Sequence, residues 1–173
     1  LAGNLKPNLG RYENPPEWDE ILKYYGGTEL KSHFEKIKNK QLRASIKPQQ
    51  VHHVAQAFDG TGKELMEKYD ERGVSRELIK ELGLENSMEQ NLKELSGGEL
   101  QRLAIAAVAS KDTEFYFFDE PSSYNDVFQR KSVARVIQSL AKMGKSVMVV
   151  EHDLTLLDFL SDYIEVLYGE PAA

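Results

Sequence analysis

The stretch LSGGELQR at residues 95–102, together with two apolar runs downstream of it, indicates how this chain folds. The runs are FYFF at 115–118 and VMVV at 147–150, and each has the length of a buried strand. Helical patterns at 99–109 and 126–143 precede the two runs. Strands that alternate with helices predict a parallel sheet, and strands without polar positions predict that both of its faces are covered. The chain is therefore predicted to have an α/β fold.

The N-terminal half is predicted to be mainly helical, because its apolar residues recur at the spacing of amphipathic helices. Two helices with a Gly-Gly break at 26–27 form a helix–loop–helix at 15–42. The residues expected on their inner faces are Trp18, Ile21, Leu22, Tyr25, Leu30, Phe34 and Ile37. The other elements expected are a strand at 44–47, a polar helical region at 51–94 with a break at 59–62, a short helix at 75–82, a helix at 154–161 and a strand at 163–167.

Composition narrows the class of protein. The chain has 173 residues, a formal net charge of −6 and no cysteine. Disulfides and cysteine-ligated zinc or iron–sulfur clusters within it are thereby excluded, which fits a cytosolic protein. No apolar run approaches the roughly 20 residues that span a bilayer, and no secretory signal pattern opens the chain. The acidic net charge argues against a protein that coats nucleic acid with its whole surface.

Positive charge is nevertheless concentrated at residues 31–47, which carry six basic residues and one acid, Glu35. Two interpretations are open: a solvated helix face, or a contact surface for RNA phosphates. The basic residues are Lys31, Lys36, Lys38, Lys40, Arg43 and Lys47.

Three polar residues follow the apolar runs directly. In parallel sheets ligands bind at the carboxyl ends of strands, which is where Asp119, Glu120 and His152 are expected. An Asp there can hold Mg²⁺, a neighbouring Glu can polarise a water for attack on a γ-phosphate, and a His can hydrogen-bond a phosphate oxygen. The alternatives are two acids that cap the next element and an ordinary polar residue that leaves a sheet.

The stretch Ser96-Gly97-Gly98-Glu99 lies at the start of a predicted helix. Two glycines let backbone amides approach an anion, and a helix N-terminus favours negative charge. The alternative is a simple N-cap with an acid in the first turn.

Two further polar residues are candidates by position. Gln49 follows the strand at 44–47, and its carbonyl oxygen can ligate Mg²⁺ and contact an attacking water. Asp126 is expected to cap the helix at 126–143, and it could also bridge to the site of a partner.

A glycine-rich phosphate loop, Gly-x-x-x-x-Gly-Lys-Ser/Thr, does not occur in the sequence. The nearest stretch, DGTGKE at 59–64, has Ala57 and Glu64 at required positions and follows no buried strand, so we interpret it as an ordinary loop. Residues 1–4 have the pattern of a helix end with Gly3 as its C-terminal cap. We therefore expect the chain to begin inside a fold.

The order of these motifs resembles that of an ABC-type ATPase nucleotide-binding domain. By that resemblance Gln49 lies in the Q-loop, 95–101 form the signature motif, 115–120 form the Walker B strand with its catalytic glutamate, Asp126 lies in the D-loop and His152 in the H-loop. The resemblance implies a P-loop NTPase-like parallel sheet, incomplete at its N-terminal side. The partial domain at 1–173 then contains a helix–loop–helix insertion at 15–42 and a helical signature region at 49–112.

The same resemblance implies ATP and Mg²⁺ as bound groups. Glu120, His152 and Gln49 would serve hydrolysis, and Asp119 and Gln49 would hold the metal. The residues that would contact nucleotide are Ser96, Gly97, Gly98, Glu99 and Asp126.

The similarity is narrower than the ABC family and runs nearly end to end. LAGNLKPNLGRY at 1–12, IKPQ at 46–49, DEPSSY at 119–124 and VEHDL at 150–154 resemble subfamily E, the ribosome-recycling factors also called RNase L inhibitors. They point to the first of that subfamily's two nucleotide domains. Asn125 departs from the pattern, because the family usually has Leu there, and the sequence does not say whether this departure alters coupling between the two ATP sites.

By the resemblance, the complete protein splits ribosomal subunits by closing two ATP sites, each with the phosphate loop of one half facing residues 96–98 of the other. The expected partners are the second nucleotide domain, small-subunit rRNA through residues 15–47 and a release-factor-like recycling protein, with no membrane partner and a cytoplasmic location. Iron–sulfur clusters are expected only in an N-terminal domain outside this chain. The chain alone is predicted to be inactive. Two other functions stay open: a non-enzymatic ribosome-docking module, and the nucleotide domain of an ABC transporter.

Overall fold

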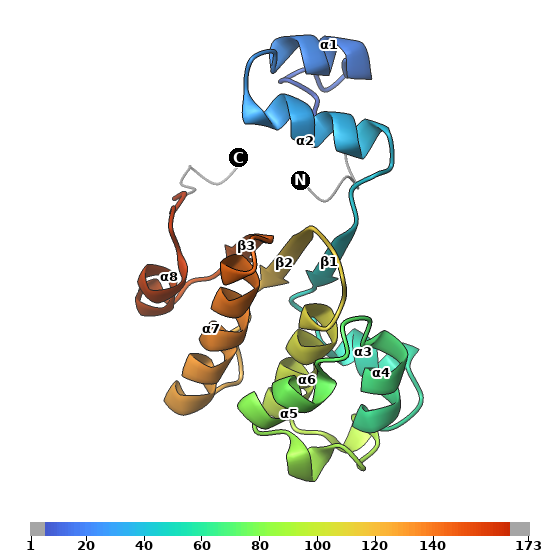
Figure 1. The fold of residues 1–173 in the computed structure, drawn as a ribbon, viewed down its shortest axis with the longest axis vertical. Helices are drawn as coiled ribbons and strands as arrows, with labels where there is room; N and C mark the ends of the chain where they lie inside the picture. Colours follow the sequence, from blue (N-terminus) through green and yellow to red (C-terminus); the bar gives the residue numbers. More distant parts are fainter. Residues whose placement is uncertain (1–5, 167–173) are drawn as a thin grey trace.

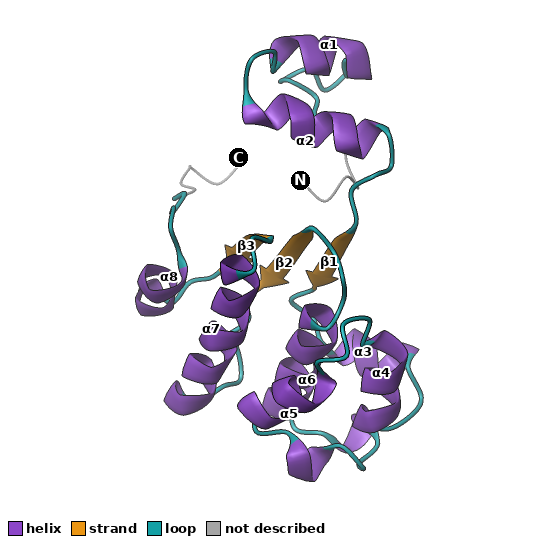
Figure 2. Cartoon of the chain, in the orientation of Figure 1, coloured by secondary structure: helices purple, strands orange, loops and turns teal. Residues whose placement is uncertain are grey.

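The computed structural model describes residues 6–166, and a three-stranded parallel sheet organises them. The strands β1 (Ala44–Lys47), β2 (Phe115–Asp119) and β3 (Ser146–Val150) lie in the order β1-β2-β3. The parallel register pairs Ser45 with Tyr116 and Tyr116 with Val147. All three carboxyl ends therefore lie at one edge, which confirms the predicted α/β fold (Figures 1 and 2).

The helix–loop–helix consists of α1 (Trp18–Tyr24) and α2 (Glu29–Lys38), which pack against each other at the opposite end of the molecule from α4 and α5 (Figure 1). Ile21 and Phe34 are buried between them, and the ring of Phe34 lies 4.9 Å from that of Tyr25. Leu30, which lies in the first turn of α2, is 42% exposed, so its predicted place on the inner face is wrong.

The polar helical region contains α3 (His52–Ala57), α4 (Gly62–Tyr69), α5 (Ser75–Glu81) and the 3₁₀ turns Glu85–Ser87 and Leu92–Glu94. The interpretation of residues 59–64 as an ordinary loop is correct for 59–61 only, because residues 62–64 form the first turn of α4. Thr61 caps α4, its hydroxyl accepts the backbone N–H of Glu64, and the carboxylate of Glu64 accepts the N–H of Thr61.

Three more helices complete the fold: α6 (Gly97–Ala109), α7 (Val127–Lys142) and α8 (Leu154–Leu160). Helices α6 and α7 contact the sheet, and α8 packs on α7. The core lies between the sheet and α6 and α7, where Tyr116, Phe118, Leu103, Ile105 and Val133 are completely or almost completely buried.

The other face of the sheet differs from the prediction. Side chains alternate along a strand, so the residues between the core positions point away from α6 and α7. Of these, Ile46, Met148 and Val150 are 37–39% exposed. Because α6 and α7 lie on the same side of the sheet (Figure 1), complete cover of both faces is wrong for residues 6–166. The second face is covered only at the start of β2, where Phe115 is 6% exposed and lies close to His33 of α2.

The predicted strand at 163–167 is also wrong where the structure describes it. Residues 163–166 are not strand, and Tyr163 and Val166 are 93% and 74% exposed. A strand needs a neighbour for its N–H and C=O groups, and neither edge of the described sheet pairs with this segment. Residue 167 and the helix end predicted at 1–4 lie outside the described residues.

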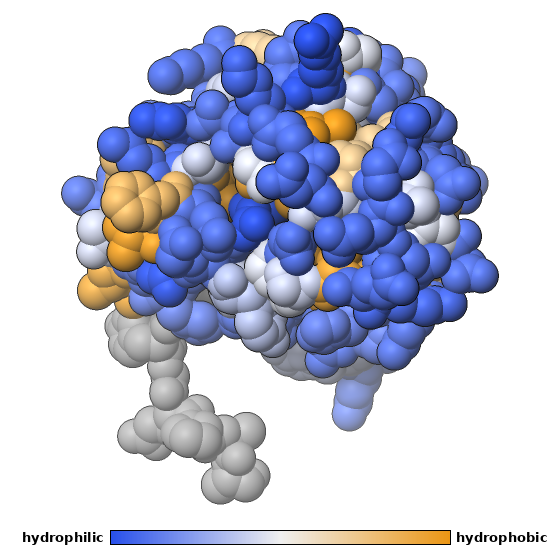
Figure 3. Space-filling model, turned by 90° about the horizontal axis from the view of Figure 1, so that it is seen from below, coloured by the Kyte–Doolittle hydropathy of each residue, from blue (hydrophilic) through white to orange (hydrophobic). Residues whose placement is uncertain are grey.

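Hydrophilic side chains dominate the surface seen from the side of α5 and the lower ends of α6 and α7, with apolar side chains gathered in a few places (Figure 3). Within residues 6–166, none of the helices has the length and hydropathy that crossing a bilayer would require.

Candidate functional site

Three predicted site residues meet at the carboxyl edge of the sheet. The carboxylate Oε1 of Glu120 accepts a hydrogen bond from Nε2 of Gln49 at 2.7 Å and lies 3.3 Å from Nε2 of His152. Its Oε2 accepts a hydrogen bond from the hydroxyl of Ser123 at 3.3 Å. The side chain of Glu120 is 21% exposed and that of His152 is 81% exposed. The carboxylate of Glu120 is therefore mostly buried but still accessible from solvent.

The backbone of Glu120 is in an uncommon conformation. Its φ is +45°, in the left-handed region that non-glycine residues seldom adopt. Its N–H donates to the carbonyl of Val150 at 2.8 Å, and its own carbonyl accepts from Nε2 of Gln101 at 2.7 Å and from the N–H of Ser123 at 3.3 Å. Backbone conformations of this kind cost of order 1–3 kcal/mol and persist where the surroundings fix them.

Lys47, the last residue of β1, is fully buried and reaches the main chain of Asp119 and Glu120. Its Nζ donates to the carbonyl of Asp119 at 2.6 Å and to that of Glu120 at 3.4 Å. Burial lowers the pKa of Lys47 to about 8, against the opposing effect of the carboxylates of Asp119, Glu120 and Glu151. Counting Lys47 with the basic surface at 31–47 is therefore a mistake, because its side chain points into the fold.

A magnesium ion fits the donors at this edge. The carboxylate of Asp119 is partly buried and accepts no hydrogen bond from residues 6–166. Gln49 donates through its amide nitrogen to Glu120, so its side-chain carbonyl oxygen is available as a ligand. The described residues contain no group of three or more His, Cys, Asp or Glu side chains placed to hold a metal ion. Mg²⁺ does not need such a cage, because it is commonly held by one or two protein oxygens together with substrate phosphates and water.

Residues 96–99 form a capping box at the start of α6. The hydroxyl of Ser96 accepts the N–H of Glu99 at 3.3 Å, and Oε2 of Glu99 accepts the N–H of Ser96 at 3.0 Å. Hydrogen bonds from Ser87 and Ser96 hold the pKa of Glu99 below its ordinary value. In this conformation the side chains of Ser96 and Glu99 satisfy the helix start, and anion binding by this segment stays a prediction.

One glycine of this segment, Gly98, is needed for packing. A Cβ on Gly98 would lie 2.7 Å from the carbonyl oxygen of Tyr124, whereas a Cβ on Gly97 would meet the Tyr124 ring at an ordinary 3.5 Å. The start of α6 therefore lies against the backbone of the turn that follows Glu120.

Buried polar contacts tie that turn to α6 a second time. Nη1 of Arg102 donates to Oδ1 of Asn125 at 3.0 Å, and Nε of Arg102 donates to the carbonyl of Leu82. The amide of Asn125 in turn donates to the carbonyls of Pro121 and Ser123. Asn125 is thus a buried bridge between the turn and α6.

Asp126 caps α7, as predicted: its carboxylate accepts the N–H of Gln129 at 2.9 Å. At the end of β3, the carboxylate of Glu151 accepts the N–H groups of His152 at 2.9 Å and Ser122 at 3.1 Å. Glu151 therefore joins the end of β3 to the turn after β2.

Sequence reasoning gave no site role to Lys47, Gln101, Arg102 or Glu151. Their signal was a polar side chain where the neighbouring residues are apolar, which is clearest for Gln101 and Arg102 within the buried stretch of α6. A pattern of this kind marks a buried polar contact, but it does not name the partner.

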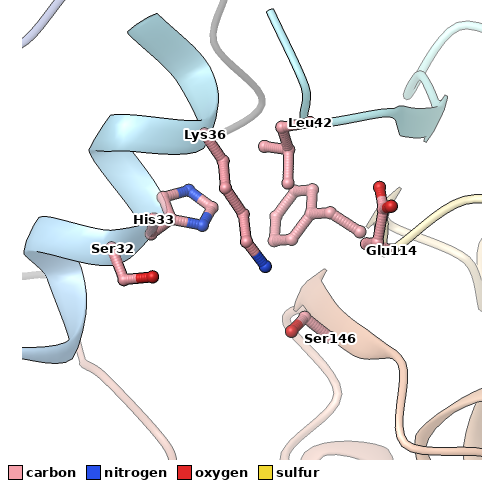
Figure 4. Close-up of a pocket in the computed structure, with 7 residues that line it drawn as sticks. Ser32, His33, Lys36, Leu42, Glu114 and Ser146 are labelled. Carbon is pink, nitrogen blue, oxygen red and sulfur yellow. The ribbon is translucent and has the colours of Figure 1, made fainter. Parts of the chain in front are cut away.

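A separate pocket of about 320 Å³ lies at the other end of the sheet, where α2 meets the starts of β2 and β3 (Figure 4). Its lining includes His33, Lys36, Glu114 and Ser146. Ligands of parallel sheets bind at the carboxyl ends of strands. This pocket is therefore where the helix–loop–helix meets the sheet, away from the strand-end acids.

The parallel sheet, the strand-end acids and the capped signature helix define an α/β domain of the P-loop NTPase type. The family model described as ABC transporter matches residues 3–123. The chain belongs to this ABC family, as a nucleotide-binding domain of subfamily E.

Relatives of subfamily E match the chain from end to end. ABC transporter E family member 1 of Arabidopsis thaliana is 49% identical over 100% of this chain and 29% of the relative. A crystal structure of an archaeal ribosomal stalk protein with the archaeal ribosome recycling factor aABCE1 has a TM-score of 0.89 and 50% identity, over 98% of this chain and 32% of that one. A structure of ribosome-bound archaeal Pelota and ABCE1 has a TM-score of 0.91 and 52% identity, over 98% of this chain and 28% of that one. The chain thus spans about a third or less of the relatives it matches.

Proposed function

We propose that this chain is part of an ATP-hydrolysing ABC protein that recycles ribosomes by splitting their subunits. The observation that carries the proposal is the carboxylate of Glu120, held between Gln49 and His152 at the carboxyl edge of a parallel sheet. Similarity to an archaeal ribosome recycling factor and to ribosome-bound ABCE1 supports the biological role. We place the protein in the cytoplasm and expect its iron–sulfur clusters in a domain outside this chain.

Glu120 is proposed to orient and polarise the attacking water. A general base must reach the proton that it accepts, and Glu120 presents its carboxylate toward the exposed side of the edge. Gln49 fixes one oxygen of this carboxylate, and His152 stands beside the same oxygen, where it can also contact the γ-phosphate. Mg²⁺, held by Asp119 and Gln49, would neutralise charge on the phosphates.

Ser96, Gly97, Gly98, Glu99 and Asp126 are proposed to serve a nucleotide held by the second nucleotide domain. The start of α6 can offer its backbone N–H groups to phosphate once an approaching nucleotide competes for the hydroxyl of Ser96. Because the sequence of this chain contains no phosphate loop, we expect little hydrolysis by the chain alone.

The test is Glu120→Gln in the full-length protein, with the second ATP site inactivated. Loss of a general base lowers turnover by about 100-fold or more, while nucleotide affinity should change little. Glu89→Gln is the matched control, because Glu89 is an exposed acid whose partner is Lys63. Unchanged turnover in Glu120→Gln would show that the assignment of the base is wrong.

We further propose that the helix–loop–helix contacts small-subunit rRNA, with a release-factor-like protein as a second partner. The surface that supports this is smaller than the basic segment of the sequence. Lys38 pairs with Asp19 at 2.7 Å and Arg43 with Glu71 at 2.8 Å, whereas Lys36 and Lys40 are exposed without an ion pair to residues 6–166. Exposed pairs are weak enough to exchange for phosphate.

Docking of this kind predicts a salt-dependent affinity for small ribosomal subunits, because phosphate contacts release counterions. The measurement is binding of the full-length protein across a series of salt concentrations. Affinity independent of salt would favour a protein partner over RNA at this surface.

A further inference from the structure

Two buried polar side chains from different elements converge on the main chain of the proposed catalytic residue. Nζ of Lys47, at the end of β1, donates to the carbonyls of Asp119 at 2.6 Å and Glu120 at 3.4 Å. Nε2 of Gln101, in α6, donates to the carbonyl of Glu120 at 2.7 Å. We propose that Lys47 and Gln101 are positioning residues that set the rate of hydrolysis by fixing the peptide of Glu120. This inference rests on the proposed function of Glu120.

The backbone conformation of Glu120 explains why a clamp is needed. A left-handed φ of +45° is unfavourable for a residue with a Cβ, so without other contacts this peptide would relax toward a commoner conformation. Relaxation would rotate the Glu120 carbonyl and move the carboxylate away from Gln49 and His152. The bond from the Glu120 N–H to Val150 fixes one side of the residue, and Lys47 and Gln101 fix the other.

Fold stability does not account for Lys47. The side chain of Lys47 is completely buried, so its charge has lost its hydration. Its Nζ donates to two neutral carbonyl groups and forms no ion pair with a carboxylate. A buried charge whose direct partners are neutral costs more than an apolar side chain of similar volume. Methionine at position 47 should therefore keep or raise the stability of the fold while it removes both hydrogen bonds.

Fold stability does not account for the buried side chain of Gln101 either. It is completely buried, and its Oε1 has no hydrogen-bond partner among residues 6–166. One half of this amide is thus unsatisfied, while the other half holds Glu120. Because α6 begins at Gly97, this contact also joins the signature segment to the proposed base through a single helix.

The test uses the full-length protein with the second ATP site inactivated and compares Lys47→Met, Gln101→Met and Glu120→Gln. We expect kcat to fall about tenfold or more in each methionine variant, as displaced catalytic groups produce, with nucleotide affinity within about twofold and a thermal midpoint equal to or above that of the parent. The double methionine variant should lose less than the product of the two single effects, because both side chains hold one carbonyl. Lys63→Met, at an exposed lysine, is the control and should change none of these three quantities.

The outcomes separate this inference from the proposed function. If Glu120→Gln leaves turnover unchanged, the proposed function fails. If Glu120→Gln removes turnover while both methionine variants keep it, the clamp is wrong and the proposed function stands. A loss of turnover that follows an equal loss of thermal stability in both methionine variants would also overturn the clamp, since it would reflect folding alone.

Discussion

The carboxyl edge of the sheet and the helix–loop–helix are built in opposite ways. At the edge, buried Lys47 and Gln101 hold the main chain of Glu120, and a buried Asn125 joins the turn to α6. On α1 and α2 the charged groups lie at the surface: Lys38 reaches Asp19, whose side chain is 90% exposed.

The difference fits the two proposed tasks. Chemistry on a phosphate requires groups fixed to a fraction of an ångström, which buried hydrogen bonds can provide. Docking on a large charged surface requires accessible cations that can exchange partners. Substitutions at the edge should therefore act on the rate of hydrolysis or on the stability of the fold, and substitutions on the helix–loop–helix should act on salt-dependent binding alone.

The largest effect should come from Asn125→Ala. This change removes the acceptor of a buried guanidinium, so we expect the free energy of unfolding to fall by about 3 kcal/mol in urea denaturation. The free energy of unfolding should fall less in Asn125→Leu, because leucine restores the packing although it cannot form the hydrogen bond. Asn86→Ala, at an exposed asparagine, is the control. A loss of less than about 0.5 kcal/mol in Asn125→Ala would mean that Arg102 finds another partner.

A second effect should appear at alkaline pH through Lys47. Its pKa is lowered to about 8 in the fold from 10.5, so below pH 8 the lysine is charged in both states and burial destabilises the fold in full. Between pH 8 and 10.5 the folded protein loses this proton first, and stability rises relative to Lys47→Met by about 2 kcal/mol after solvent screening. Parallel stability curves for the two proteins over this range would contradict the buried, desolvated lysine.

Next in size should be the change Gly98→Ala. The added Cβ would lie 2.7 Å from the carbonyl oxygen of Tyr124, so the turn or the start of α6 must shift, at an expected cost of about 1.5 kcal/mol. Gly97→Ala makes an ordinary 3.5 Å contact and serves as the matched control. Equal thermal midpoints for the two variants would show that the close approach is not a constraint.

The smallest effect should come from the helix–loop–helix. Lys36→Gln together with Lys40→Gln should reduce the slope of log affinity against log salt by about 2 for small ribosomal subunits, with stability unchanged. Lys47→Met is an informative control, because Lys47 belongs to the same basic stretch but is buried. If Lys47→Met lowered the slope as much as the exposed pair does, the division between the two regions would fail.

Much of the fold followed from local pattern. The strand at 146–150 and the cap at Asp126 agree with the sequence because periodicity and capping are properties of neighbouring residues. The strand expected at 163–167 failed because an apolar run becomes a strand only where another strand can pair with it. The prediction that the second face is fully covered was wrong for a related reason, because the apolar sequence of a strand does not determine which helices pack against each of its faces.

The sequence by itself determined the α/β class, the family and the positions of Gln49, Asp119, Glu120 and His152, because these depend on the order and spacing of motifs along the chain. Only the tertiary structure decided that Lys47 leaves the basic surface for the core and that Gln101 and Asn125 bridge α6 to the turn after β2. The physical reason is that a buried polar side chain is defined by its hydrogen-bond partner, and these partners lie 19 to 73 residues away in sequence.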